Sequence, residues 1–116
     1  MAPMPGKKQK RAEEQRTPMQ VAIDSAKTSS YNLCTPMYEA QHIRLRNPVT
    51  GLDQLYSSSS SIFYEAFYEL VELGLKDKLM SEIDFFAKNI DSKWSDVYTN
   101  LNYYIESKGE GKVNEN

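Results

Sequence analysis

Few residues of this chain have the type and the spacing that chemistry requires. Cys34 and His42 are the only cysteine and the only histidine, and a thiol beside an imidazole is a pair that nucleophilic catalysis uses. Their separation of eight residues implies no contact, and no third group is placed to orient the histidine. A glycine-rich phosphate loop and a Gly-x-Ser-x-Gly motif are also missing from the sequence. We therefore predict a protein that is not an enzyme and has no catalytic or cofactor-binding residues.

Three glutamates form a second group that invites a chemical interpretation. Glu65, Glu69 and Glu72 are spaced by four and three residues, which places their carboxylates on one side of a helix. Helical metal sites combine such glutamates with histidines on neighbouring helices, and His42 lies outside this region. The spacing therefore predicts a solvated acidic face, and we expect no metal site.

A basic cluster near the N-terminus is the third group, and its members are Lys7, Lys8, Lys10 and Arg11. Clustered positive charges attract phosphates, and similar clusters serve in nucleic-acid binding. Residues 1–16 have five basic residues against two glutamates, a net charge of +3, and no apolar periodicity. We predict a flexible basic arm over residues 1–16 whose candidate partner is nucleic acid or an acidic protein.

Aromatic residues suggest a protein-binding surface. The tyrosines and the tryptophan of the C-terminal half are Tyr64, Tyr68, Tyr98, Tyr103, Tyr104 and Trp94. Such residues are enriched at binding hot spots because they join a large apolar area to a polar tip. The segment around Phe67 is apolar over an arc too wide to face two partner helices. We predict protein-binding residues at Tyr64, Phe67, Tyr68 and Val71.

The elements that must position these residues are read from the apolar spacing. From Leu52 to Ile105, apolar residues recur at intervals of three and four, as on the buried face of a helix. The pattern predicts an all-α fold whose antiparallel helices span about 51–73, 75–89 and 92–107, and Gly74 occupies the left-handed end of the first. This three-helix body at 51–107 is followed by a tail, 108–116, that we expect to be disordered.

The segment 17–50 is predicted to contain short helices and turns. Thr17-Pro18-Met19-Gln20 is a typical helix start, and a helix from Pro18 to about Ser30 should follow. Residues 38–46 favour a second short helix, although the alternation of Ile43-Arg44-Leu45-Arg46 also fits an edge strand. The serine run 57–61 allows one long helix, which we prefer, or a break with a new helix near Ser61.

The length and composition of the chain restrict its domain number, its cellular location and its class of protein. A chain of 116 residues holds one ordinary domain, and no apolar run approaches the length of a membrane span. The N-terminus lacks the apolar segment of a secretory signal, and a single cysteine makes no internal disulfide. We expect an intracellular protein, neither secreted nor membrane-spanning. From residue 49 onward, six lysines against twelve acidic residues give a net charge of −6, which disfavours a nucleic-acid groove in the body.

Three functions are compatible with these features. The first is a non-enzymatic structural or adaptor subunit that assembles through aromatic helix faces with a partner or with itself, as in a viral or phage-like particle. The first alternative is a small nucleic-acid-associated regulator that uses the basic arm. The second alternative is an acidic helical inhibitor, of the immunity-protein type, that blocks a basic partner. No small-molecule substrate is evident in the sequence.

Overall fold

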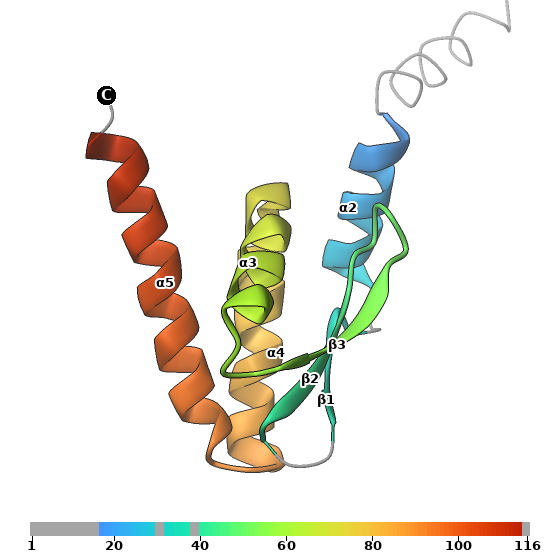
Figure 1. The fold of residues 1–116 in the computed structure, drawn as a ribbon. Helices are drawn as coiled ribbons and strands as arrows, with labels where there is room; N and C mark the ends of the chain where they lie inside the picture. Colours follow the sequence, from blue (N-terminus) through green and yellow to red (C-terminus); the bar gives the residue numbers. More distant parts are fainter. Residues whose placement is uncertain (1–16, 30–31, 38–39, 115–116) are drawn as a thin grey trace, which may run out of the picture.

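The structure, a computed structural model, describes residues 17–29, 32–37 and 40–114, without the side chains of residues 110–114. The N-terminal half of this region contains one helix and three strands, in the order α2 (Pro18–Thr28), β1 (Cys34–Met37), β2 (His42–Arg46) and β3 (Asp53–Ser57). The remainder is helical, in the order α3 (Ser61–Leu70), η1 (Val71–Leu75), α4 (Lys76–Asn89) and α5 (Trp94–Asn114). In Figure 1 the strands lie below α2 and to the right of α4 and α5. The fold is mixed α+β.

Our prediction of an all-α helical bundle is therefore wrong. In the described residues, β1, β2 and β3 form an antiparallel sheet in that order, with β2 in the centre. The helix that we favoured over residues 38–46 is replaced by β2, in which Ile43 and Leu45 are buried and the alternate residues His42, Arg44 and Arg46 are not. This is the period of two that a strand with one buried face requires. The strand alternative was the better interpretation, although β2 is a central strand and not an edge.

The predicted helix 51–73 begins too early, because a hairpin occupies its first residues. Asn47 accepts hydrogen bonds at its side-chain oxygen from the N–H groups of Val49 and Thr50, and Gly51 has a φ of +78°. These features turn the chain from β2 into β3. Leu52 is exposed, so the helical spacing of the apolar residues here did not correspond to a buried helix face.

The serine run separates β3 from α3. The hydroxyl of Ser60 accepts the N–H of Ile62 at 3.1 Å and caps the helix that begins at Ser61. Ser58 is buried, and its hydroxyl donates to the carbonyl of Ala40 at 3.1 Å. One long helix through the serines is therefore wrong, and a new helix does begin at the position that our alternative gave. Serine hydroxyls compete with helical backbone bonds and favour caps and turns, which explains the outcome.

The other helix boundaries are closer to the prediction. Thr17 caps α2 by accepting the N–H of Gln20 at 3.0 Å, as the sequence indicated. Gly74 has a φ of +90° within η1, where the chain turns from α3 into α4. A residue with a side chain is strained in this backbone conformation, so glycine belongs there. α5 ends at Asn114 and not near Ser107, so part of the tail that we expected to be disordered is helical.

One hydrophobic core joins the helices to the sheet. Its largest fully buried side chains include Phe63 and Phe67 of α3, Phe86 of α4 and Trp94 of α5. Phe86 and Trp94 meet edge to face, with ring centroids 5.7 Å apart, and this contact fixes the turn between α4 and α5. From that turn α5 rises along α4 and stands apart from α3 at its upper end in Figure 1.

Candidate protein-interaction site

The buried polar cluster of the described region is centred on the carboxylate of Glu82 in α4, which is 9% exposed. One carboxylate oxygen accepts the backbone N–H groups of Leu33 and Cys34, each at 2.9 Å, and the Cys34 thiol lies 3.2 Å from it. The ammonium group of Lys78 lies 3.3 Å from the other oxygen and also donates to the carbonyl of Ser29 at 3.0 Å. These charge-assisted bonds tie α4 to the start of β1 and to the end of α2.

The interactions around Glu82 stabilise the fold. Cys34 is fully buried, and burial, then the charge and the hydrogen bond of Glu82, raise the pKa of its thiol well above the ordinary value. Since the thiolate is the reactive form of cysteine, a thiol in this environment is a poor nucleophile. The carboxylate is already engaged by two backbone N–H groups, a thiol and an ammonium group. The cluster therefore has a structural role.

Cys34 and His42 are kept apart by the sheet register, as their separation in sequence suggested. Cys34 is opposite Leu45 in the β1–β2 pair, whereas His42 is opposite Met37, three positions along β1. Side chains alternate between the two faces of a sheet, so an offset of three positions also puts them on opposite faces. The geometry excludes a thiol–imidazole dyad.

The predicted protein-binding residues do not share one surface. Phe67 is fully buried in the core, so its side chain cannot contact a partner on this surface, and we correct that assignment. Tyr64, Tyr68 and Val71 are half-buried and pack against the core. The basic residues proposed for nucleic acid or an acidic partner lie outside the described residues; they are Lys7, Lys8, Lys10 and Arg11.

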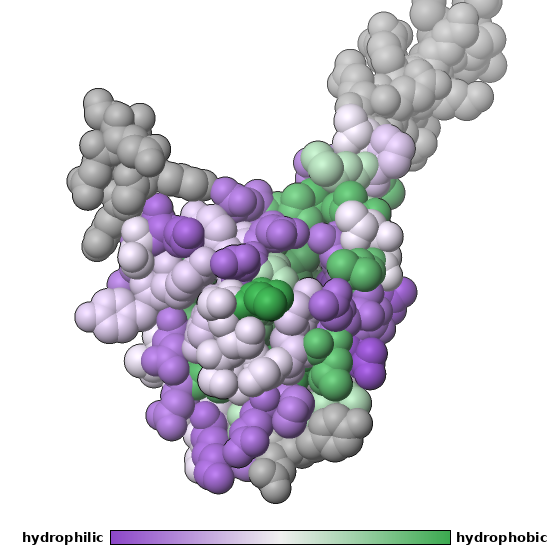
Figure 2. Space-filling view, in the orientation of Figure 1, coloured by the Kyte–Doolittle hydropathy of each residue, from purple (hydrophilic) through white to green (hydrophobic). Residues whose placement is uncertain are grey.

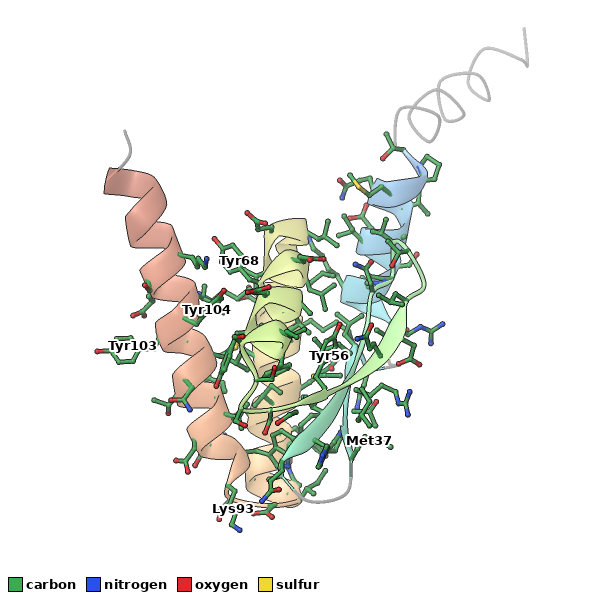
Figure 3. The ribbon with its side chains drawn as sticks, in the orientation of Figure 1. Met37, Tyr56, Tyr68, Lys93, Tyr103 and Tyr104 are labelled. Carbon is green, nitrogen blue, oxygen red and sulfur yellow. The ribbon has the colours of Figure 1, made fainter. Side chains whose placement is uncertain are left out.

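Three tyrosines, Tyr64, Tyr68 and Tyr104, meet between α3 and α5. Together with Tyr103, which lines the same shallow groove from α5, we call them the tyrosine cluster. The ring of Tyr104 lies 5.5 Å from that of Tyr64 and 6.1 Å from that of Tyr68, measured between centroids, and meets Tyr68 edge to face. Figure 3 shows Tyr68 and Tyr104 between the two helices and Tyr103 directed away from them. Tyr103 is 74% exposed.

A shallow groove accompanies the tyrosine cluster, and its lining residues are Tyr64, Asn100, Tyr103, Tyr104 and Ser107. The ammonium group of Lys108 lies 5.3 Å from the centre of the Tyr104 ring, a cation–π distance. Amide, hydroxyl and aromatic groups thus border the same groove. Such a mixture suits recognition of another protein.

Sequence reasoning found half of this cluster. Tyr64 and Tyr68 were predicted as contacts, whereas Tyr103 and Tyr104 were named only among the aromatic residues of the C-terminal half. In the structure Tyr104 is half-buried against Tyr64 and Tyr68. The helical spacing gave the face of each residue, but it gave no information on which two helices meet.

The predicted acidic face of α3 borders the tyrosine cluster. Glu65, Glu69 and Glu72 are exposed; Glu65 directly follows Tyr64 in α3, and Glu72 lies in η1, about one helical turn after Tyr68. Within the described residues, no three acidic, histidine or cysteine side chains are grouped so as to hold a metal ion. The three glutamates therefore add negative charge to the surface beside the tyrosine cluster.

Comparison with known proteins found no matching family model, no matching curated protein and no matching solved structure. Over the part of the chain that the structure describes, none of the helices has the length and apolar character of a membrane span. Function must therefore be inferred from the geometry.

Proposed function

We propose that this protein is a non-enzymatic binding subunit, structural or adaptor in role, that contacts a partner protein through the tyrosine cluster. The observation that carries the proposal is the 74% exposure of Tyr103 beside three half-buried tyrosines. A large aromatic side chain in water gains free energy when a partner covers it, and tyrosine is enriched at the centres of protein interfaces.

The half-buried tyrosines supply a prepared surface for such a partner. Tyr64, Tyr68 and Tyr104 are held by ring contacts with one another, so little side-chain freedom remains to be lost on binding. Ordering a free side chain at an interface costs about 0.5–1.5 kcal/mol. Preorganisation of three rings therefore favours binding at this place over other parts of the surface.

The electrostatic surroundings indicate the chemistry of the partner. Glu65 and Glu72 lie beside the tyrosine cluster, and the chain from residue 49 onward carries a net charge of −6. A groove between two helices accepts a third helix, as in helix-in-groove recognition. The partner we propose is a protein segment with lysine or arginine beside an apolar helix face. The single cysteine, which can form no internal disulfide, supports an intracellular location for this pairing.

Site-specific photo-crosslinking tests the proposal in the cells from which the protein comes. A photoreactive phenylalanine analogue replaces Tyr103 in one variant and Lys93, an exposed residue of the α4–α5 turn, in the matched control. We expect one discrete crosslinked protein from position 103 and none from position 93. Equal crosslinking at both positions, or none at position 103, would contradict the proposal.

A further inference from the structure

The two outer strands of the sheet differ in how their free edges are protected. In the described part of the chain, β1 and β3 each pair with β2 alone, so each has one edge without a strand partner. An open edge presents backbone N–H and C=O groups to which another strand can add. Natural proteins block such edges with charges, with proline or with a covering element.

The edge of β1 is blocked twice. Arg46 donates its N–H to the carbonyl of Leu33, and with the antiparallel register this directs the backbone groups of Cys34 and Pro36 away from β2. The outward N–H of Cys34 is taken by Glu82 at 2.9 Å. Pro36, the next outward residue, has no N–H to offer. Strand addition on this side would find no free donor along β1.

The edge of β3 is open by comparison. The carbonyl of Leu52 accepts the N–H of Asn47, and the N–H of Ser58 donates to the carbonyl of Gln41. With the antiparallel register, the backbone N–H and C=O groups of the even-numbered residues therefore point toward β2. The odd-numbered residues of β3, which are Asp53, Leu55 and Ser57, then direct their N–H groups outward. All three are exposed, and no side chain among the described residues accepts these N–H groups.

Apolar side chains accompany the open edge. Leu52 is 57% exposed, Leu55 39% and Ile62 of α3 60%. Figure 2 shows separate hydrophobic side chains over α3 and β3, and a further hydrophobic area over α2. A small hollow between β3 and α3 is lined by Tyr56 of β3, by Ala66 of α3 and by Leu52, which precedes β3. An added strand would cover apolar surface as well as form backbone hydrogen bonds.

We infer that β3 pairs antiparallel with β3 of a second copy of this chain, which extends the sheet across a two-fold axis at Leu55. The outward-directed residues of one copy must pair with those of the other, and a two-fold axis at Leu55 places Asp53 of each copy opposite Ser57 of its partner. Leu55 then pairs with its own counterpart, and each Asp53 faces a Ser57, so no like charges are opposed. This inference is independent of the tyrosine cluster.

The mass of the protein in solution over a concentration series, measured by light scattering, tests the pairing. We expect a concentration-dependent dimer whose dissociation constant rises about tenfold or more in Leu55→Lys, because two lysines then face each other at the axis. The matched control Thr99→Lys adds the same charge on the exposed side of α5 and should leave the dimer unchanged. Tyr103→Ala should also leave it unchanged. A monomer at every concentration, or a dimer that Tyr103→Ala but not Leu55→Lys dissociates, overturns the inference.

Crosslinking through introduced cysteines tests the register directly. In the proposed pair the Cα atoms of the two Leu55 residues lie about 5.5 Å apart, whereas those of the two Ser57 residues are separated by about 14 Å. A short bis-maleimide should therefore crosslink two Leu55→Cys chains efficiently and two Ser57→Cys chains poorly. The native Cys34 is buried, so it should contribute little to the crosslinking. Equal crosslinking of the two variants, or none of either, overturns the inference.

Discussion

The backbone N–H of Cys34 donates a hydrogen bond of 2.9 Å to the carboxylate of Glu82, which lies 48 residues further along the chain. This bond joins the first strand of the sheet to α4 and closes the edge of β1. Lys78, one helical turn before Glu82, balances the charge of the carboxylate at 3.3 Å. The same contact therefore secures the sheet against the helices and leaves β3 as the edge at which the sheet can grow.

Removal of the charge at Glu82 should destabilise the fold. In Glu82→Gln the amide oxygen still accepts a backbone N–H, but the amide nitrogen is brought toward Lys78 and the charge-assisted bonds are lost. We expect the free energy of unfolding to fall by about 2 kcal/mol, as measured by urea titration. Asp84→Asn removes a half-exposed carboxylate that pairs with the exposed Lys88 on the same helix, and should cost much less. Equal losses of unfolding free energy in the two variants would show that the buried Glu82 cluster does not stabilise the fold more than an exposed ion pair does.

The buried thiol should make stability depend on alkaline pH. Because the pKa of Cys34 is raised in the folded state, its thiol stays protonated there while the unfolded chain ionises above the ordinary value of 9.0. Its contribution is complete below that pH and is lost above it by up to about 1.4 kcal/mol per pH unit. The free energy of unfolding of the wild type should therefore fall more steeply between about pH 9 and pH 10 than that of Cys34→Ala. Parallel profiles would contradict this assignment.

Two aromatic substitutions should differ in their effect on stability, because one is in the core and the other is on the proposed binding surface. Phe67 is fully buried, so Phe67→Ala should lower the free energy of unfolding by about 3–5 kcal/mol. Tyr103 is mostly exposed, so Tyr103→Ala should change it by less than about 0.5 kcal/mol. Thermal or urea unfolding measures both. A large loss in Tyr103→Ala would mean that this ring serves the fold and not a partner.

The cap of α3 provides a test of the serine run. Ser60→Ala removes the hydroxyl that accepts the N–H of Ile62, and should cost about 1 kcal/mol. The neighbouring Ser61→Ala, at an exposed position inside the helix, is the control and should be nearly neutral. If the two substitutions have the same effect on urea unfolding, the cap contributes nothing to stability.

The sequence predicted the helices better than the sheet. α4 and the cap of α2 were found because apolar spacing and capping residues are local signals. β3 was missed because Leu52, Leu55 and Tyr56 also fit a helical spacing, whereas in the structure Leu52 and Leu55 are exposed and form no buried helix face. Strand pairing joins residues through a register that no short window contains.

The sequence predicted that the candidate site is a protein-binding surface, but it did not predict all of the residues that form it. The aromatic residues of the C-terminal half indicated a protein-binding surface, and two of the four cluster members, Tyr64 and Tyr68, were named as contacts. Phe67 was misassigned because burial depends on which helices and strands cover α3, and the sheet that covers it was not predicted. The role of Glu82 was also missed, since a glutamate within a helix gives no sign that its partners lie on a distant strand.

The affinity for the partner captured at position 103 tests the central claim most directly. Isothermal titration calorimetry with the purified partner would compare the wild type, Tyr103→Ala and the control Lys93→Ala. We expect Tyr103→Ala to weaken binding by about 2 kcal/mol, roughly thirtyfold in Kd, and Lys93→Ala to leave it unchanged. Wild-type affinity in Tyr103→Ala would contradict the assignment of the tyrosine cluster as the binding surface.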